Sequence, residues 1–241
     1  MEVRDIFLAA LLLLAGFLFF GRKRRYKRTS YYRMTRNPYR LTMEDKGRFG
    51  EYQIYKRLSA YEQDGGQFLF NCYLPGERGE TTEIDVILIH KSGIYVFESK
   101  NYSGWIYGRE SDRTWTQILR QKIRFPNPLR QNQLHVARVR KALGLRREAP
   151  VYSLVVFSDR CVLKKVRVER PDRQVTTWKR LKHAMRKFAK KQPYALEEAD
   201  VQAYASQLYP CSQATRREKK KHIRDIQKRQ KRRGWIRRFW E

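Results

Sequence analysis

Three ionisable residues, Asp85, Glu98 and Lys100, lie in or at the end of two short apolar segments. The segments, 82–89 and 94–100, are rich in β-branched residues and are separated by a four-residue break that contains serine and glycine, which predicts two strands joined as a hairpin. Because both strands are apolar on both faces, we expect them in the core of a sheet. Charged side chains are costly to bury there unless they pair with one another or hold a metal ion.

This set of side chains suits one kind of chemistry. Two carboxylates on neighbouring strands can bind a hard cation such as Mg²⁺ or Mn²⁺, and the ion can polarise a phosphate and activate a water molecule. A lysine beside them can orient that water or stabilise the charge that develops on phosphorus. We therefore predict metal-dependent cleavage of phosphodiester bonds, with Asp85 and Glu98 as metal ligands. The alternative is a structural ion pair of Lys100 with one of the two carboxylates.

The segment before the hairpin, residues 45–61, has apolar residues at close to helical spacing. It contains Gly47 and Gly50 in its first turns, and glycine weakens a helix. We expect the helix backbone to approach a neighbour closely there, with the sheet as the candidate. Glu51 in the same turn is either a site residue or a carboxylate that offsets the helix dipole.

A second helix is predicted over residues 129–143. Asn127 suits its N-cap, Pro128 its first position and Gly144 its end. The apolar segment 151–157 follows as a strand buried on both faces. Gln131 lies in the first turns of this helix. As a polar residue it would, without further information, be predicted on the solvated surface of the helix.

These pieces, in this order, resemble the nuclease-related domain (NERD) family, a branch of the PD-(D/E)XK or restriction-endonuclease-like superfamily. The resemblance covers roughly residues 43–160 and is carried by Gly47-Arg48-Phe49-Gly50-Glu51, Thr82-Glu83-Ile84-Asp85, the segment from Gly93 to Tyr102, Gly104-Trp105-Ile106 and the segment from Asn127 to Gln133. It implies an α/β fold with a mixed central sheet flanked by helices, in which segment 151–157 is the parallel strand after the crossover helix. It also implies a catalytic site made of Glu51, Asp85, Glu98, Lys100 and Gln131.

The charge of the chain is extreme and unevenly distributed. The 241 residues carry a formal net charge of +30. Residues 22–40 hold nine Lys or Arg and no acid, and residues 215–241 hold thirteen basic residues against three acidic ones. Such segments bind nucleic acid or anionic lipid, or are simply solvated. We expect nucleic acid, with DNA favoured over RNA, as the principal partner, because the resembled fold handles that polymer.

Three widely spaced cysteines, Cys72, Cys161 and Cys211, and four scattered histidines form no zinc-binding motif. A reducing compartment fits this cysteine usage.

The N-terminus has the pattern of a membrane anchor. An apolar run, Ile6 to Phe20, follows a net acidic start and precedes a strongly basic block that begins at Arg22. The charge distribution predicts an uncleaved transmembrane helix within residues 1–21, with the remainder of the chain in the cytoplasm. A cleaved signal peptide and a buried core helix are the alternatives.

The remaining segments complete the predicted organisation. We expect a basic linker over 22–42, the nuclease-related domain over 43–165, a helical extension over 166–210 and a basic helical tail over 211–241. The extension is predicted to contain an edge strand near 167–171 and helices over 176–190 and 195–208. In the tail, Ile223 and Ile226 form an apolar stripe too thin to dock on a core.

Two classes of function follow from these features. The first is a membrane-anchored, metal-dependent nuclease. The second is a non-catalytic protein on a nuclease fold that binds nucleic acid or a membrane as a scaffold, since a fold does not fix a function.

Overall fold

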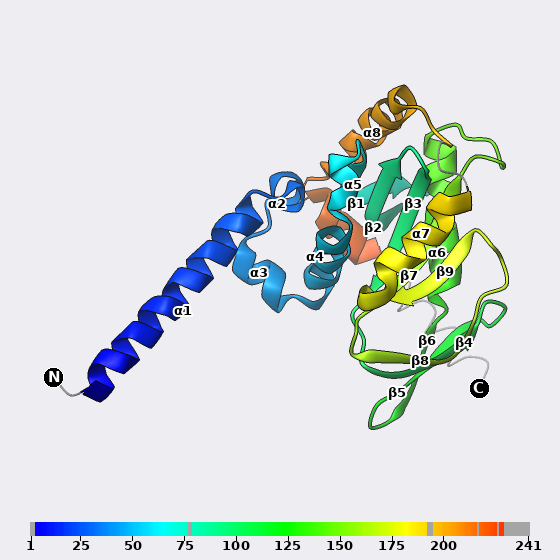
Figure 1. Ribbon diagram of the computed structural model, residues 1–241. Coiled ribbons are helices and arrows are strands. Elements are labelled where there is room, and N and C mark those ends of the chain that lie inside the picture. The colour runs from blue at the N-terminus through cyan, green and yellow to red at the C-terminus, as the bar shows by residue number, and fades with distance from the viewer. Residues whose placement is uncertain (1–2, 77–78, 192–194, 216, 226, 229–241) are drawn as a thin grey trace.

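The computed structural model describes residues 3–76, 79–191, 195–215, 217–225 and 227–228 (Figure 1). Its central sheet has five strands in the order β1-β2-β3-β7-β9. The strands are β1 (Gln67–Pro75), β2 (Thr81–His90), β3 (Gly93–Lys100), β7 (Val151–Phe157) and β9 (Arg173–Thr177). The first three are antiparallel neighbours, whereas β7 runs parallel to both β3 and β9. The predicted mixed sheet is therefore confirmed, as is the parallel strand over 151–157.

Helices cover both faces of this sheet (Figure 1). On one face, α4 (Lys46–Leu58) and α7 (Leu181–Lys191) share a core cluster with Phe70, Val86 and Phe97. On the other, α6 (Pro128–Ala142) and α8 (Glu198–Ser212) pack on a second cluster that includes Ile87 and Val96. Short elements, α5 (Ala60–Gln63) and the 3₁₀ turn η1 (Trp178–Arg180), connect these layers.

A second, smaller sheet has the order β6-β5-β4-β8. Its strands are β4 (Gly104–Arg109), β5 (Thr114–Ile118), β6 (Lys122–Pro126) and β8 (Cys161–Arg167). The ring of Trp115 stacks on Phe157 of β7 with the ring centroids 6.3 Å apart, so the two sheets share an apolar contact. An edge strand was predicted near residues 167–171, but residues 168–171 belong to the connection between β8 and β9. That prediction is wrong, because the edge strand is β9, which begins after Pro171.

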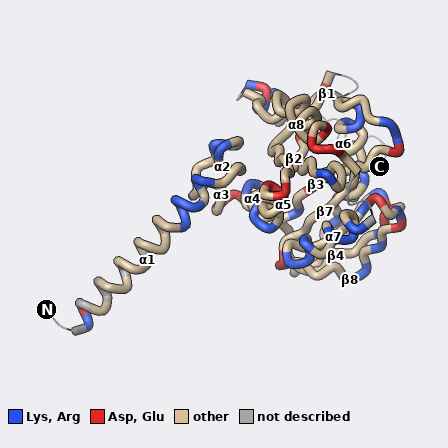
Figure 2. Tube along the Cα trace, turned by 45° about the horizontal axis from the view of Figure 1, so that its top comes forward, with Lys and Arg blue, Asp and Glu red and all other residues tan. Residues whose placement is uncertain are grey.

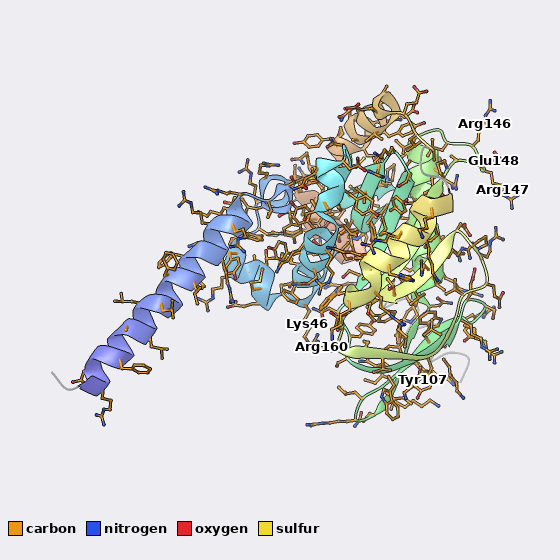
Figure 3. All side chains as sticks on the ribbon, viewed as in Figure 1. Lys46, Tyr107, Arg146, Arg147, Glu148 and Arg160 are labelled. Atoms are coloured by element: carbon orange, nitrogen blue, oxygen red, sulfur yellow. The ribbon has the colours of Figure 1, made fainter. Side chains whose placement is uncertain are left out.

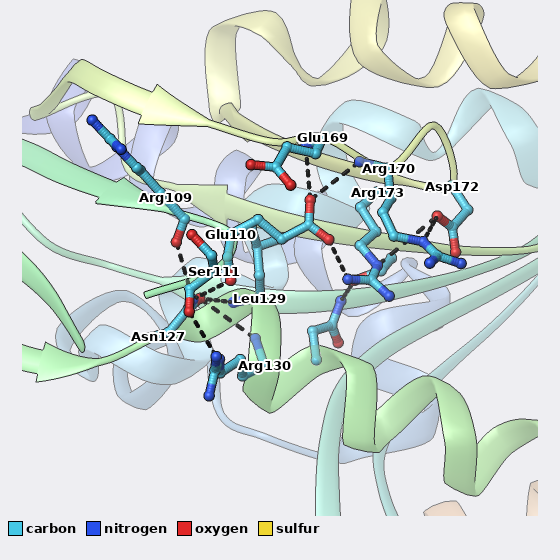
Figure 4. A network of polar contacts seen from close by, with 12 residues as sticks. Arg109, Glu110, Ser111, Asn127, Leu129, Arg130, Glu169, Arg170, Asp172 and Arg173 are labelled. Atoms are coloured by element: carbon cyan, nitrogen blue, oxygen red, sulfur yellow. Dashed lines mark hydrogen bonds and ion pairs between the residues drawn. The ribbon is translucent and has the colours of Figure 1, made fainter. Parts of the chain in front are cut away.

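Glu110 ties the two sheets together through polar contacts (Figure 4). Its carboxylate accepts hydrogen bonds from the backbone N–H groups of Glu169, at 2.7 Å, and Arg170, at 3.2 Å. It also pairs with the guanidinium of Arg173 in β9. Since a buried carboxylate is stable only when its oxygens are satisfied, these contacts fix the second sheet against the edge of the first.

Asn127 fixes the start of α6 (Figure 4). Its amide donates hydrogen bonds to the carbonyl oxygens of Arg109, Glu110 and Asp112, at 3.2, 3.0 and 2.7 Å. Its side-chain oxygen accepts from the backbone N–H of Leu129 at 2.9 Å, as an N-cap does. The predicted cap is thus confirmed, and it holds the first turn of α6 to the smaller sheet.

In β1 and β2, the alternation of side chains between the two faces of the sheet is interrupted at one position. Phe70 and its partner Val86 face the α4 side, yet the pair two residues further along the ladder, Cys72 and Ile84, faces the α6 side. Asn71 at the break has a positive φ of 49°. Such irregularities bend a strand and redirect its side chains. Here the irregularity lies opposite Asp85.

Residues 22–42, expected to be a basic linker, are largely helical and partly buried. The first helix, α1 (Val3–Lys27), extends through the basic block and is followed by α2 (Ser30–Thr35) and α3 (Tyr39–Glu44). Tyr26 and Tyr31 are fully buried against α4. The sequence did not predict this burial, because the tyrosines alternate with arginines and the composition of the segment is polar. The division of the chain into domains stays a prediction.

The N-terminal part of α1 projects away from the sheets, with basic residues at the end nearer to them (Figure 2). Its described apolar side chains are exposed, among them Phe17 at 76 %. Side chains at positions 3, 6, 8, 9, 12 and 15 are not described. Among the described residues, no helix is both long and apolar enough to span a membrane, so the predicted transmembrane helix is not found there.

The glycine prediction for α4 can be tested directly. A Cβ at Gly50 would overlap Ser99 Oγ of β3, so we expect Gly50→Ala to lower the free energy of unfolding by roughly 1–3 kcal/mol. Ser99 Oγ is buried and has no hydrogen-bond partner among the described residues, so Ser99→Ala in the same chain should restore most of the loss in denaturant unfolding.

Gly47→Ala is the matched control in the same helix. The nearest atom to its added Cβ is Asp45 Oδ1, the N-cap oxygen of α4, at 3.3 Å, which needs to move by only a few tenths of an ångström. Alanine should be neutral or slightly stabilising there. Equal losses at both glycines, or no recovery with Ser99→Ala, would disprove close approach as the reason for Gly50.

Candidate active site

Glu98, Lys100 and Gln131 form the centre of the candidate site. Lys100 Nζ donates hydrogen bonds to Glu98 Oε1, at 2.6 Å, and to Gln131 Oε1, at 3.1 Å. Both partners are fixed by secondary structure, because Glu98 is two residues before Lys100 on β3 and Gln131 is in the first turns of α6. The ion pair that was the structural alternative for Lys100 is therefore present, and it lies at the end of a central strand.

Asp85 lies at the break in β2, where the pairing of β2 with β3 has ended. Its Oδ2 accepts a hydrogen bond from the backbone N–H of Ser99 at 2.7 Å, which holds the carboxylate across the end of β3. Burial raises the pKa of Asp85 well above its ordinary value, and the charges of Glu98 and Glu51 raise it further. The site thus brings carboxylates close enough to repel one another.

Glu51 approaches from α4 on the opposite face of the sheet from α6. The carboxylate is 7 % exposed, and its Oε2 accepts a hydrogen bond from the hydroxyl of Tyr31 at 3.1 Å. Burial raises the pKa of Glu51 to about 7, although side-chain hydrogen bonds from Asn71 and Tyr31 oppose the rise. The backbone of Gly50, packed on Ser99, is what allows Glu51 to lie this close to the strand end.

His135 lies one turn after Gln131 on α6 and faces Glu98. His135 Nδ1 is 3.4 Å from Glu98 Oε2, both atoms are buried, and neither makes a hydrogen bond of good geometry to any described residue. Burial lowers the pKa of His135, and the charge of Glu98 only partly offsets this effect. One oxygen of Glu98 is therefore satisfied by Lys100, while the other is left available to a further partner.

Lys100 remains charged in this setting. Burial alone would lower its pKa, but the negative charges of Glu98 and Asp85 outweigh burial and raise the pKa. A cationic ammonium group is thus fixed between acidic groups at a strand end. This is the arrangement that stabilises negative charge on a bound anion or on a phosphorus centre.

The donor set fits a hard cation. Asp85 and Glu98 supply carboxylate oxygens, and Glu98 Oε2 is a buried oxygen without a hydrogen bond. No group of three His, Cys, Asp or Glu side chains in the described part of the chain is arranged to hold a metal. Mg²⁺ needs no such cluster, because it is usually bound by one or two carboxylates and completes its shell with water and substrate phosphate.

Basic side chains border the end of β3 beyond this centre. Asn101 Nδ2 donates to the carbonyl oxygen of Lys46 at 2.8 Å, and its side-chain oxygen accepts from Arg160 at 2.7 Å. Figure 3 shows Lys46 and Arg160 close together beside α4. Positive charge at this rim complements a phosphate backbone.

All five residues that the sequence indicated lie around this strand end. The structure adds Tyr31, Asn71 and His135, which the sequence reading did not assign to the site. The single usable signal was the spacing of His135 and Gln131, which puts them on one helix face. Tyr31 and Asn71 come from segments to which no element had been assigned.

The raised pKa of Glu51 generates a prediction about stability. A carboxyl group whose pKa is raised by folding favours the native state below its unfolded pKa of about 4.5, and this advantage is lost as the pH rises through about 7. The shift corresponds to at most roughly 3 kcal/mol. Glu51→Gln removes the titration, so in chelator the variant should gain free energy of unfolding over wild type between pH 5 and pH 8.

Denaturant unfolding of both proteins at each pH measures this difference. Glu44→Gln is the control, because Glu44 is an exposed carboxylate paired with Arg40 on the surface. A difference between wild type and Glu51→Gln that stays constant from pH 5 to pH 8 would show that Glu51 titrates normally.

Comparison with known proteins agrees with this geometry. The family model described as "Nuclease-related domain" (NERD) matches residues 46–158, the part of the chain that contains Glu51, Asp85, Glu98, Lys100 and Gln131. An uncharacterized protein of Bacillus anthracis is 35 % identical over 144 residues, which cover 59 % of this chain and 67 % of that protein. No solved structure matches the chain. The chain therefore belongs to the nuclease-related domain family.

Proposed function

We propose that this protein is a metal-dependent nuclease that hydrolyses phosphodiester bonds, with DNA as the favoured substrate. The observation that carries the proposal is the contact of Lys100 with Glu98 and Gln131, next to Asp85, whose pKa is raised by burial and further by the neighbouring carboxylates. An ion pair that served stability alone would not require Gln131, Asp85 and Glu51 as further polar groups at the same strand end.

The residues have distinct roles in this proposal. Asp85 and Glu98 would hold Mg²⁺ or Mn²⁺, which would polarise the scissile phosphate and lower the pKa of a water molecule. Lys100 holds its ammonium group toward the reacting phosphate and stabilises the charge that develops there. Gln131 orients Lys100 through its side-chain oxygen, and Glu51 adds a carboxyl group from α4 whose pKa of about 7 suits proton transfer near neutral pH.

The alternative is a non-catalytic protein that uses the same fold to bind nucleic acid or to act as a membrane-associated scaffold. The support for this alternative is the extreme positive charge of the chain, which gives affinity for polyanions whether or not the protein cleaves them. The two functions differ in whether Asp85, Glu98 and Lys100 affect cleavage.

We expect the full-length protein to cut DNA with Mg²⁺ or Mn²⁺ and not in chelator. Asp85→Ala and Glu98→Ala should each abolish cleavage, because each removes a metal ligand. Lys100→Ala should lower the rate by about 10²–10³-fold while leaving metal binding largely intact. Cleavage of supercoiled, linear, branched and single-stranded DNA, and of RNA, measures these effects and identifies the substrate.

Glu44→Ala is the matched control for these variants, because it removes an exposed carboxylate far from β3 in the chain. Full activity in chelator, or undiminished activity of Asp85→Ala, would contradict the metal mechanism. No cleavage of any substrate by wild type would favour the scaffold.

We further propose that α1 attaches the protein to a membrane, with the sheets on the cytoplasmic side. The support is its exposed apolar side chains, among them Leu13, Leu14 and Phe17, followed by the basic block at residues 22–28. Such an arrangement places apolar groups in lipid and positive charge at the anionic cytoplasmic surface. The basic segments 22–40 and 215–241 would add electrostatic contact with anionic lipid.

Replacing Leu13, Leu14 and Phe17 with serine should move the protein from the membrane fraction to the soluble fraction. Neutralising Arg22, Lys23 and Arg24 with glutamine is the comparison, and it should weaken attachment only at low salt, because high salt already screens the attraction of these residues to anionic lipid in wild type. Resistance of wild type to alkaline extraction would indicate insertion. A mature protein that starts near residue 22 would instead reveal a cleaved signal and refute the attachment.

A further inference from the structure

The basic segment after α8 is docked on the β1–β2 hairpin. In the described part of this segment, residues 217–225 and 227–228 are helical, and we refer to them as the tail helix. His222 in the tail helix is 5 % exposed, and its Nδ1 lies 2.9 Å from Thr81 Oγ1 of β2. Its ring packs edge-to-face on Tyr73 of β1, with ring centroids 5.3 Å apart.

This docking corrects the expectation that the tail is too polar to pack on a core. The predicted apolar stripe is not responsible, since Ile223 is half exposed and position 226 lies outside the described residues. A buried histidine makes the contact instead. Its ring supplies apolar area, while its nitrogen satisfies a polar group on the sheet.

Two further contacts join the tail helix to this hairpin, one to Tyr73 and one to Glu83. Lys219 Nζ lies 5.9 Å from the ring centroid of Tyr73, within the range of a cation–π interaction. His222 Nε2 lies 3.9 Å from Glu83 Oε2, and the hydroxyl of Tyr73 donates to Glu83 Oε1 at 2.6 Å. Tyr73 and Glu83 are register partners across the two strands, so the tail helix bridges β1 and β2.

The docking point is next to the candidate active site. Glu83 lies two residues before Asp85 on β2, with Ile84 buried between them. Burial is the main reason why the pKa values of Glu51 and Tyr73 are raised, and smaller contributions come from the charge of Glu83 on Glu51 and from the charges of Glu83, Glu51 and Asp85 on Tyr73. The residues that hold the tail helix therefore share an electrostatic environment with the site carboxylates.

The tail helix presents positive charge to solvent at this place. Its exposed basic side chains are Arg217, Lys220, Lys221, Arg224 and Lys228, against the acidic Glu218 and Asp225. Basic groups on a docked helix have a fixed position relative to the site, whereas a detached basic segment would bind phosphates anywhere. Their spacing along one helix is suited to several phosphates of one backbone.

We propose that the tail helix forms one wall of the nucleic-acid-binding surface and is held there by His222, so that it binds the phosphates of a DNA duplex beside the carboxylate site. The inference rests on the proposed nuclease function for its choice of polymer. Its test uses binding alone, which keeps failure of the inference separate from failure of the chemistry.

The experiment measures binding of full-length protein to a short fluorescent DNA duplex over a range of salt concentrations. Every protein carries Asp85→Ala and the buffer contains chelator, so cleavage plays no part. One variant replaces Lys220, Lys221 and Arg224 with glutamine, and another is His222→Ala. The matched control replaces Lys182, Arg186 and Lys187, which are exposed on α7, with glutamine.

The charge variant should flatten the log–log salt slope by about 2–3 and weaken binding by about tenfold or more, since each neutralised phosphate contact contributes roughly 0.9 to the slope. His222→Ala should lose hydrogen-exchange protection in residues 217–225 and weaken binding at least threefold, although it keeps every basic residue. The α7 control should change neither the slope nor the affinity by a comparable amount.

Three results would overturn the inference. If the charge variant behaves like the α7 control, the tail helix is not part of the binding surface. If His222→Ala releases the helix and leaves DNA affinity unchanged, docking does not position it. If the charge variant loses affinity for anionic vesicles but not for duplex, the tail helix is a membrane contact.

Discussion

The repulsion among buried carboxylates at the end of β3 is the constraint on which the rest of this structure depends. Asp85, Glu98 and Glu51 are brought together from two strands and a helix, where Glu98 and Glu51 are buried and Asp85 is partly buried. Folding this arrangement costs free energy unless positive charge or hydrogen bonds offset it. Lys100, the backbone N–H of Ser99 and the hydroxyl of Tyr31 supply part of that compensation. A hard cation between the carboxylates would supply the remainder.

The elements around the site can be understood as supports for these side chains. Gly50 lets α4 lie against β3, and Asn127 fixes the first turn of α6 on the smaller sheet. The irregularity at Asn71 redirects the strands where Asp85 must leave the core. Helices on opposite faces of the sheet thus reach the same strand end, and the helices of one face alone could not surround it. The N-terminal helices and the tail helix extend this support from both ends of the chain.

Much of the site was predictable because its members lie in elements with strong local patterns. The hairpin with Asp85, Glu98 and Lys100 follows from β-branched runs, and the helix that carries Gln131 follows from its cap and proline. Tyr31 was missed because a buried tyrosine between arginines looks like part of a polar linker. Asn71 was missed because a positive φ leaves no periodic signal, and His222 because one buried ring suffices to dock a helix that is otherwise polar. These residues depend on tertiary contacts, which local spacing does not encode.

The central claim is that the strand end is a hard-cation site, and the binding of Mn²⁺ tests it most directly. Titration of the full-length protein with Mn²⁺, followed by electron paramagnetic resonance, separates bound from free ion without any substrate. The account predicts a bound Mn²⁺ that is lost in Glu98→Gln and in Asp85→Asn, and that is retained in the surface variant Glu44→Gln. Wild-type protein that binds no Mn²⁺, or binding that persists undiminished in Glu98→Gln, would contradict it.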